Sequence, residues 1–337
     1  MARAKIRPTE ITPAVPNRKL VFALGCGLSF ALVYFIFVFT AHGQWLENRI
    51  LWEQDLLQPA SAANDHAGPI GALIRRVPML GDLRHISIAS IAIAIGCLLL
   101  IGMLRRRWWL GFIASGVVGC SVVAAEVLKE LLPRPSLHES IEGTAHNSFP
   151  SGHTAIAVSI VLAAILVSPN RLRSFVALFG ALWAGAIAAA TVAVGWHRPS
   201  DTLGGALLAS GVFGIAVAVV TQYGILSSDT SQGTKVSLLA SRLLLAGASL
   251  SFLVSAWWLM RLIAAYFGAD TRDGSLNFAE ALASGFTLLA IVTALWLLRP
   301  GLSAVVPEQR RKRNDKSVGW SSKDIPRPRH FLTRKSQ

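Results

Sequence analysis

The sequence predicts an all-α, polytopic membrane protein with about eight membrane-spanning helices. Hydrophobic residues make up 53% of the 337-residue chain, and charged residues make up only 15%. The mean hydropathy is +0.52. Several apolar runs reach about 20 residues, the length that crosses a hydrocarbon core of roughly 30 Å as a helix. Helices are expected there because they pair their backbone polar groups internally, as a lipid environment requires.

The apolar runs give the order of the elements. The first run begins near Leu20 and lacks a convincing small-residue cleavage site, so we interpret it as a retained span rather than a signal peptide. The predicted spans are residues 20–41, 86–104, 109–128, 153–167, 175–195, 202–223, 238–266 and 279–298. Because their number is even, the two ends of the chain are expected on the same side of the membrane.

The basic residues predict which side that is. The net charge is +14, and much of the excess lies in residues 1–19 and 299–337. Lys and Arg beside spans mark the cytoplasmic side and contact anionic lipid headgroups, so this distribution favours membrane topology over nucleic-acid binding. The short basic segments around 105–107 and 171–173 fall on the same side as both tails. We therefore predict a plasma-membrane protein with both termini in the cytoplasm.

The segment 42–85 is then extracytoplasmic, and it includes the stretch "GQWLENRILWEQDLLQ". Its mixture of Trp, Leu and charged residues is typical of an interfacial amphipathic helix. A short cap over the outer ends of the spans is an equally good interpretation.

Two further outer segments contain the candidate catalytic residues. "KELLPRPSLHESIEGTAHNSFPSGH" ends at His153, and "GWHRPSD" contains His197 and Asp201. Between the two histidines the chain crosses the membrane once, turns and crosses back. The topology therefore places both imidazoles at the same membrane face. Asp201 follows His197 by one helical turn, a spacing that can orient the imidazole ring.

These residue types favour chemistry on a phosphoryl group. Lys and Arg neutralise phosphate oxygens, and the start of a helix offers free N–H groups with a positive dipole end. One histidine can attack phosphorus while the other protonates the leaving oxygen. No carboxylate cluster indicates a catalytic metal, so we expect neither a metal nor a cofactor.

The motifs resemble those of the type 2 phosphatidic acid phosphatase superfamily over about residues 85–223. "PSGH" at 150–153 matches the second motif, and "HRPSD" at 197–201 supplies the His and Asp of the third. The resemblance implies a six-helix phosphatase-like core followed by two extra C-terminal spans. It also implies a nucleophilic His197 that forms a phosphohistidine, a general acid His153, an orienting Asp201, and phosphate ligands at Lys129, Ser151 and the Gly152 amide.

Two arginines expected from the family motifs are absent. Ser136 occupies the Arg position of the first motif, and Thr191 occupies the Arg position of the third. Arg134 and Arg198 are the natural substitutes as phosphate-binding residues.

The resemblance also divides the chain. We predict a basic cytoplasmic tail (1–19), a membrane-embedded phosphatase-like domain (20–223), two additional transmembrane helices (224–300) and a basic, disordered cytoplasmic tail (301–337).

The predicted function is metal-independent hydrolysis of a lipid phosphate or diphosphate at the outer membrane face. The family implies phosphatidate, diacylglycerol diphosphate, phosphatidylglycerophosphate or polyprenyl diphosphates as substrates, and the outer face favours cell-envelope lipids. Two alternatives remain open. One is a lipid phosphotransferase that uses the same intermediate, and the other is a non-catalytic lipid-binding or transport protein of the same fold.

Overall fold

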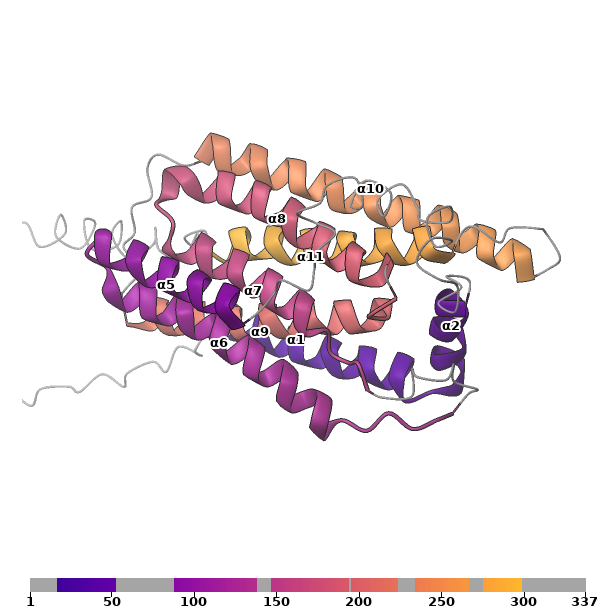
Figure 1. Ribbon diagram of the computed structural model, residues 1–337. Coiled ribbons are helices and arrows are strands. Elements are labelled where there is room, and N and C mark those ends of the chain that lie inside the picture. The colour runs from indigo at the N-terminus through magenta and orange to yellow at the C-terminus, as the bar shows by residue number, and fades with distance from the viewer. Residues whose placement is uncertain are drawn as a thin grey trace, which may run out of the picture. The chain divides into compact units, whose positions relative to one another are not determined.

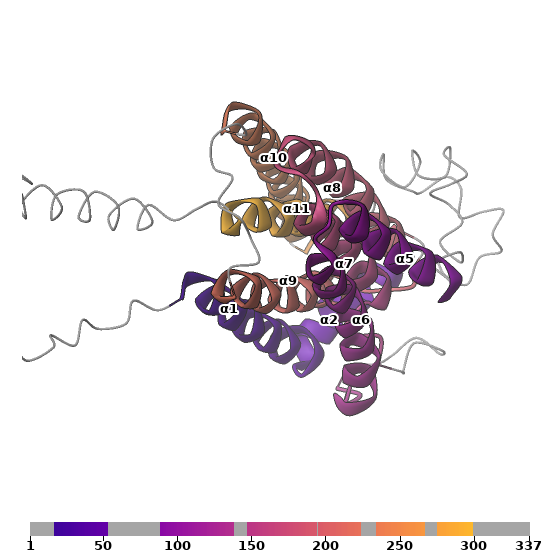
Figure 2. The ribbon, with the colours of Figure 1, turned by 90° about the vertical axis from the view of Figure 1, so that its left-hand side faces the viewer.

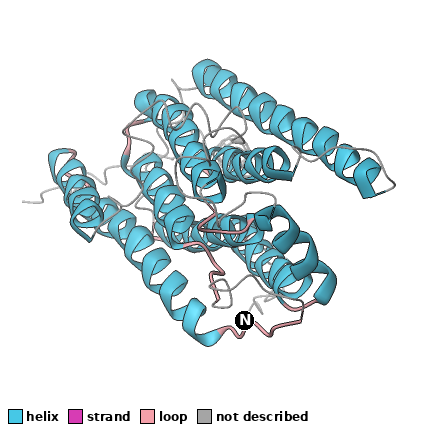
Figure 3. Ribbon diagram, turned by 45° about the vertical axis from the view of Figure 1, so that its right-hand side comes forward, coloured by secondary structure: helices cyan, strands magenta, loops and turns pink. Residues whose placement is uncertain are grey.

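A computed structural model describes residues 17–52, 88–137, 147–193, 195–223, 234–266 and 275–298. Its regular elements are helices, and the described residues contain no strand (Figures 1 and 3). The helices are α1 (Arg18–Val33), its π-helical continuation η1 (Tyr34–Val38), α2 (Ala41–Trp52), α5 (Ile88–Leu104), α6 (Trp108–Leu131), α7 (Gly152–Val167), α8 (Asn170–Ala193), α9 (Pro199–Gln222), α10 (Thr234–Tyr266) and α11 (Ser275–Leu297). The predicted tail 301–337 lies outside the described residues, as does nearly all of the tail 1–19.

The predicted spans are present as helices. Within the described residues, six helices are long and apolar enough to cross a membrane. They are Arg18–Val38, Trp108–Leu131, Asn170–Ala193, Pro199–Gln222, Leu238–Arg261 and Phe278–Leu297. The shorter apolar helices α5 and α7 complete the eight predicted segments. The chain is therefore a polytopic helical membrane protein, as its composition predicted.

Helix α7 is the central element of the packing. Nearly all of its residues are buried, and it contacts α6, α8 and α9 (Figure 2). Its 16 residues extend about 24 Å at 1.5 Å per residue, which is less than a hydrocarbon core of roughly 30 Å. A helix apolar on all sides is expected where protein rather than lipid surrounds it.

The helix directions place the motif segments at one end of the bundle. The turn between α5 and α6 lies beside the end of α7, because the Arg105 guanidinium donates to the Val167 carbonyl. Arg173 donates to the carbonyl of Ile165 (3.1 Å), so the basic turns gather there. The end of α6, the start of α7, the end of α8 and the start of α9 therefore meet at the opposite end, which α2 crosses (Figure 1).

The last two helices pack on this core. α11 contacts α8 and α9, and α10 contacts α11 and α8 (Figure 2). Phe278, Ala279 and Ala283 of α11 are buried against Ala188 and Val192 near the end of α8. These two additional helices thus support the helix that leads into the His197 loop.

The start of α7 approaches α9 at a pair of glycines. A Cβ added to Gly205 would lie 2.5 Å from the Ser151 carbonyl oxygen, and one added to Gly204 would lie 2.5 Å from the Phe149 ring. Both distances are shorter than van der Waals contact. Small residues at helix interfaces allow such close backbone approach in membrane proteins.

We therefore expect Gly205→Ala to lower the free energy of unfolding by about 1–3 kcal/mol, because the methyl group forces the PSGH segment away from α9. Thermal unfolding in detergent measures this. Gly116→Ala is the control, since a Cβ there meets nothing within 4 Å and alanine favours the helix. Equal melting temperatures for the two variants would contradict the packing argument.

Candidate functional site

The PSGH segment forms the beginning of α7. Ser151 is the N-cap, and its hydroxyl oxygen accepts a hydrogen bond from the Thr154 N–H (3.3 Å). Gly152 and His153 are then the first two helical residues, whose N–H groups have no partner within the helix. These donors and the positive end of the helix dipole form a surface suited to an anion.

Asn147 ties the segment before α7 to the end of α6. Its amide nitrogen donates to the carbonyls of Lys129 (3.2 Å) and Leu132 (2.8 Å), and its oxygen accepts from the Phe149 N–H (3.1 Å). The Phe149 side chain is fully buried and its ring lies against those of Phe30 and Tyr34. The start of α7 is therefore fixed relative to both α6 and α1.

The His197 loop is held by the end of α8. The N–H groups of Trp196 and His197 both donate to the Thr191 carbonyl, at 3.1 and 3.2 Å. Here the main chain of Thr191, the position of a missing motif arginine, positions the histidine. The ring centroids of His153 and His197 lie 5.7 Å apart, with an interplanar angle of 63°. The structure thus brings together the two imidazoles from α7 and from the loop before α9.

Asp201 lies behind His197. It is fully buried in the first turn of α9, and its Oδ2 is 3.6 Å from Nδ1 of His197. The same oxygen accepts hydrogen bonds from the Ser148 hydroxyl (2.6 Å) and the Arg198 N–H (2.9 Å). Because Nδ1 is the ring nitrogen that faces the carboxylate, Nε2 is the nitrogen available for chemistry.

Lys129 reaches the start of α7 from α6. Its Nζ forms an ion pair with Glu126 (2.7 Å), and a Cβ added to Gly152 would lie 3.1 Å from that Nζ. The ammonium group is therefore beside the first turn of α7, on the His153 side of the site. The lysine side chain is partly exposed, at 22%.

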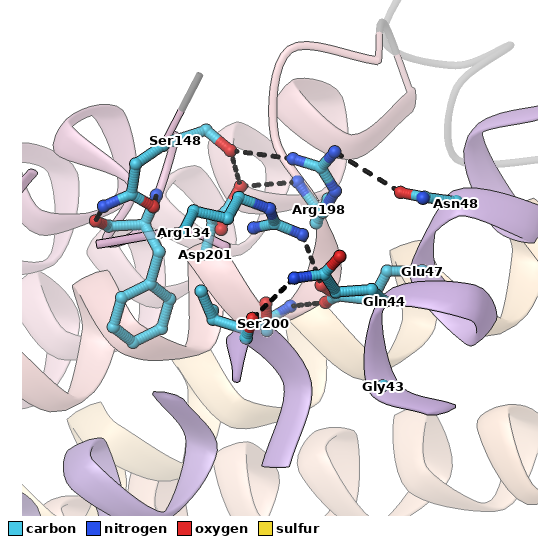
Figure 4. Close-up of polar contacts among 12 residues, drawn as sticks. Gly43, Gln44, Glu47, Asn48, Arg134, Ser148, Arg198, Ser200 and Asp201 are labelled. Carbon is cyan, nitrogen blue, oxygen red and sulfur yellow. Dashed lines mark hydrogen bonds and ion pairs between the residues drawn. The ribbon is translucent and has the colours of Figure 1, made fainter. Parts of the chain in front are cut away.

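The two arginines lie between Asp201 and helix α2 (Figure 4). Arg198 donates to the Ser148 hydroxyl (3.2 Å) and to the Asn48 side-chain oxygen (3.4 Å). The Arg134 Nη2 is 3.6 Å from Oε2 of Glu47. Ser136, the other position of a missing motif arginine, is exposed.

Helix α2 is the part of this site that the sequence left undetermined. Gln44, Glu47 and Asn48 occupy one face of α2, and each is at most 5% exposed. The Gln44 side chain donates to the Pro135 carbonyl (2.6 Å) and accepts from the Leu137 N–H (3.2 Å). The described part of segment 42–85 therefore caps the bundle end, as one of the two interpretations predicted. The i, i+3, i+4 spacing of these polar residues was the available signal.

Glu47 is a fully buried carboxylate. Its Oε1 accepts from the Ser200 N–H (3.1 Å) at the start of α9. Burial raises its pKa to about 7, and the nearby Asp201 carboxylate adds to the rise. The Ser200 N–H and the Arg134 and Arg198 guanidinium groups oppose it by favouring the ionised form. The glutamate therefore changes charge near neutral pH.

The fold and this site together define an integral membrane protein with a paired-imidazole centre at one end of its helices. Residues 106–225, which contain α6 to α9, match the family model of the PAP2 superfamily. This match supports the type 2 phosphatidic acid phosphatase superfamily that the motifs predicted. Members of the superfamily are phosphatases, which indicates a phosphatase-type activity on phosphoesters. No curated protein matched the chain, and no solved structure matched it.

The Ser148 hydroxyl connects Asp201 to Arg198, so Ser148→Ala should leave both groups short of one partner. We expect the free energy of unfolding to fall by about 1–3 kcal/mol. Ser210→Ala is a matched control, because the buried Ser210 hydroxyl has no hydrogen-bond partner among the described residues. If thermal unfolding showed the same fall in melting temperature for both variants, the result would argue against a stabilising role of the Ser148 hydrogen bonds.

The raised pKa of Glu47 makes the stability depend on pH. Between its ordinary value of 4.5 and about 7, the native state binds more protons at this group than the unfolded state does. The Glu47 contribution to stability is therefore present at low pH and is lost as the pH rises through this window. We expect the melting temperature of Glu47→Gln to fall less than that of the wild type between pH 5 and pH 7.5. Identical pH profiles would contradict the assignment.

Proposed function

We propose that the protein is a metal-independent membrane lipid phosphatase that acts through a phosphohistidine. The observation that carries the proposal is the 5.7 Å separation of the His153 and His197 rings at the start of α7. Both imidazoles are close enough to act on one phosphoryl group, and Lys129 lies beside them. The superfamily match over α6 to α9 supports the same chemistry.

In the first half of the reaction, Nε2 of His197 attacks phosphorus and the bond from phosphorus to the lipid oxygen breaks. Protonated His153 donates its proton to that oxygen. The lipid part of a phosphate monoester therefore leaves as an alcohol rather than an alkoxide, and that of a diphosphate leaves as a lipid phosphate with one negative charge fewer. Asp201 holds the His197 ring through Nδ1 and stabilises the positive charge that develops on it.

In the second half, water attacks the phosphohistidine and His153 accepts its proton, so that inorganic phosphate leaves and both histidines return to their starting state. The phosphate oxygens are bound by Lys129, by the Ser151 hydroxyl and by the Gly152 N–H at the start of α7. Arg134 and Arg198 add positive charge from the Asp201 side.

The membrane helices indicate a lipid substrate, whose chain stays in the bilayer while its phosphate reaches the end of α7. We infer that this end faces away from the cytoplasm, because the basic turns around Arg105 and Arg173 lie at the other end of the helices. The outer face favours a cell-envelope lipid phosphate or diphosphate over a cytoplasmic substrate.

The mechanism predicts that His197→Ala abolishes phosphate release and that His153→Ala lowers kcat by roughly 10²- to 10⁴-fold, the usual contribution of a general acid. Phosphate release from phosphatidate, diacylglycerol diphosphate, phosphatidylglycerophosphate and a polyprenyl diphosphate is measured in detergent with a chelator present. His42→Ala is the control, because His42 is an exposed histidine on α2 and should not alter turnover. Wild-type turnover by His197→Ala would contradict the mechanism.

Two alternatives are separated by the same preparation. A lipid phosphotransferase forms the phosphohistidine but yields a phosphorylated acceptor in place of inorganic phosphate. A non-catalytic lipid-binding protein forms no phosphohistidine, so rapid acid-free quenching with radiolabelled substrate leaves the protein unlabelled.

A further inference from the structure

Helix α2 buries a polar face rather than an apolar one. Gln44, Glu47 and Asn48 are 3%, 1% and 5% exposed, whereas Trp45 on the same helix is 37% exposed. Burial of three polar side chains is unfavourable unless they form specific hydrogen bonds or ion pairs. The contacts of this face therefore indicate what α2 does in the molecule.

Each arginine of the site has a partner on α2. Oε2 of Glu47 lies 3.6 Å from Nη2 of Arg134, and the two side chains are 2% and 6% exposed. The Asn48 oxygen accepts from Nη2 of Arg198 at 3.4 Å. Figure 4 shows both arginines between α2 and Asp201. The helix thus holds the two cations from the side opposite Asp201.

Arg134 and Asp201 each retain unused hydrogen-bonding capacity. Among the described residues, neither terminal nitrogen of Arg134 has a hydrogen-bond partner, and Oδ1 of Asp201 has none. A buried guanidinium and a buried carboxylate that lack hydrogen-bond partners attract each other strongly, because few solvent molecules screen their charges. Glu47 is the second carboxylate that competes for Arg134.

We propose that Glu47 is a positioning residue of the site, which holds Arg134 away from Asp201 so that the Asp201 carboxylate stays available to His197. Without the Glu47 charge, Arg134 and Arg198 share one carboxylate, and Arg134 moves onto the free oxygen of Asp201. The developing positive charge on His197 then loses much of its counter-charge. The kinetic part of this inference rests on the proposed phosphatase mechanism, and the structural part does not.

The groups that face Glu47 define the conditions for a test. They are Arg134 after α6, Arg198 before α9, and Asp201 and the Ser200 N–H of α9. At pH 8 the Glu47 carboxylate is ionised, since its pKa is about 7. Glu47→Gln keeps the size of the side chain and an oxygen acceptor for Ser200, and it removes only the charge.

The kinetic test is a double-mutant cycle at pH 8 with whichever of phosphatidate and a polyprenyl diphosphate the wild type hydrolyses. Glu47→Gln should lower kcat by roughly 10- to 100-fold, as misplaced catalytic groups do, and leave KM within about threefold. In an Arg134→Met background the same change should alter kcat by less than about threefold, because Glu47 acts through Arg134. Equal losses in both backgrounds, or an unchanged kcat, overturn the proposal.

Glu130→Gln is the matched control, since it removes an exposed carboxylate from the end of α6 and should leave kcat unchanged. A structural readout that needs no turnover uses histidine-selective NMR labelling. At pH 8, where Glu47 is ionised, the His197 ring resonances should shift in Glu47→Gln and should stay fixed in Glu130→Gln. Unchanged His197 resonances in Glu47→Gln at pH 8 overturn the proposal.

The two hypotheses fail in different ways. A wild type that forms no phosphohistidine and releases no phosphate refutes the proposed function, while the NMR comparison at pH 8 still decides the role of Glu47. If Glu47→Gln does not fold, Glu47→Met, which also removes the charge, takes its place in the same measurements. Loss of folded protein in both variants assigns Glu47 to the stability of the fold and overturns the positioning role.

Discussion

The arrangement of the site depends on one buried residue, Asp201. Its main-chain carbonyl accepts from the Ser151 N–H (2.8 Å), and its carboxylate accepts from the Ser148 hydroxyl and the Arg198 N–H. These three bonds fix the start of α7, the preceding segment and the His197 loop to the same turn of α9. A carboxylate in an apolar bundle is stable only with such partners. The requirement to satisfy Asp201 therefore also sets the relative positions of the two imidazoles.

Close packing is the second condition for this arrangement. The bond from Ser151 to the Asp201 carbonyl requires the two backbones to touch, and the Gly204–Gly205 pair makes that approach possible. Asn147 holds the other side of the PSGH segment on α6. Both histidines are therefore positioned by main-chain contacts to rigid helices, which is the arrangement expected for groups that must keep a fixed separation during a reaction.

The parts of the molecule that local sequence could predict are those governed by hydropathy and spacing. The length of the apolar runs predicts the eight apolar segments. The two membrane crossings between His153 and His197 predict that these residues lie close together. The position of Asp201 follows from its i+4 spacing. The partners of the arginines were not predictable in this way, because Asn48 and Arg198 are 150 positions apart. Local sequence also gave two equally good interpretations of α2, since a polar face can meet either solvent or buried charge.

The departures from the family motifs and the polar face of α2 are parts of one arrangement. The third motif carries Thr191 in place of an arginine, and here Thr191 is fully buried and its carbonyl anchors the His197 loop. Arg134 lies two positions before Ser136, which occupies the Arg position of the first motif, and it forms an ion pair with Glu47. Two buried guanidinium groups would be strongly unfavourable beside apolar helices without compensating carboxylates. Asp201, and Glu47 when it is ionised, supply negative charge to Arg134 and Arg198, so α2 covers the altered cation positions with side chains that pair with them.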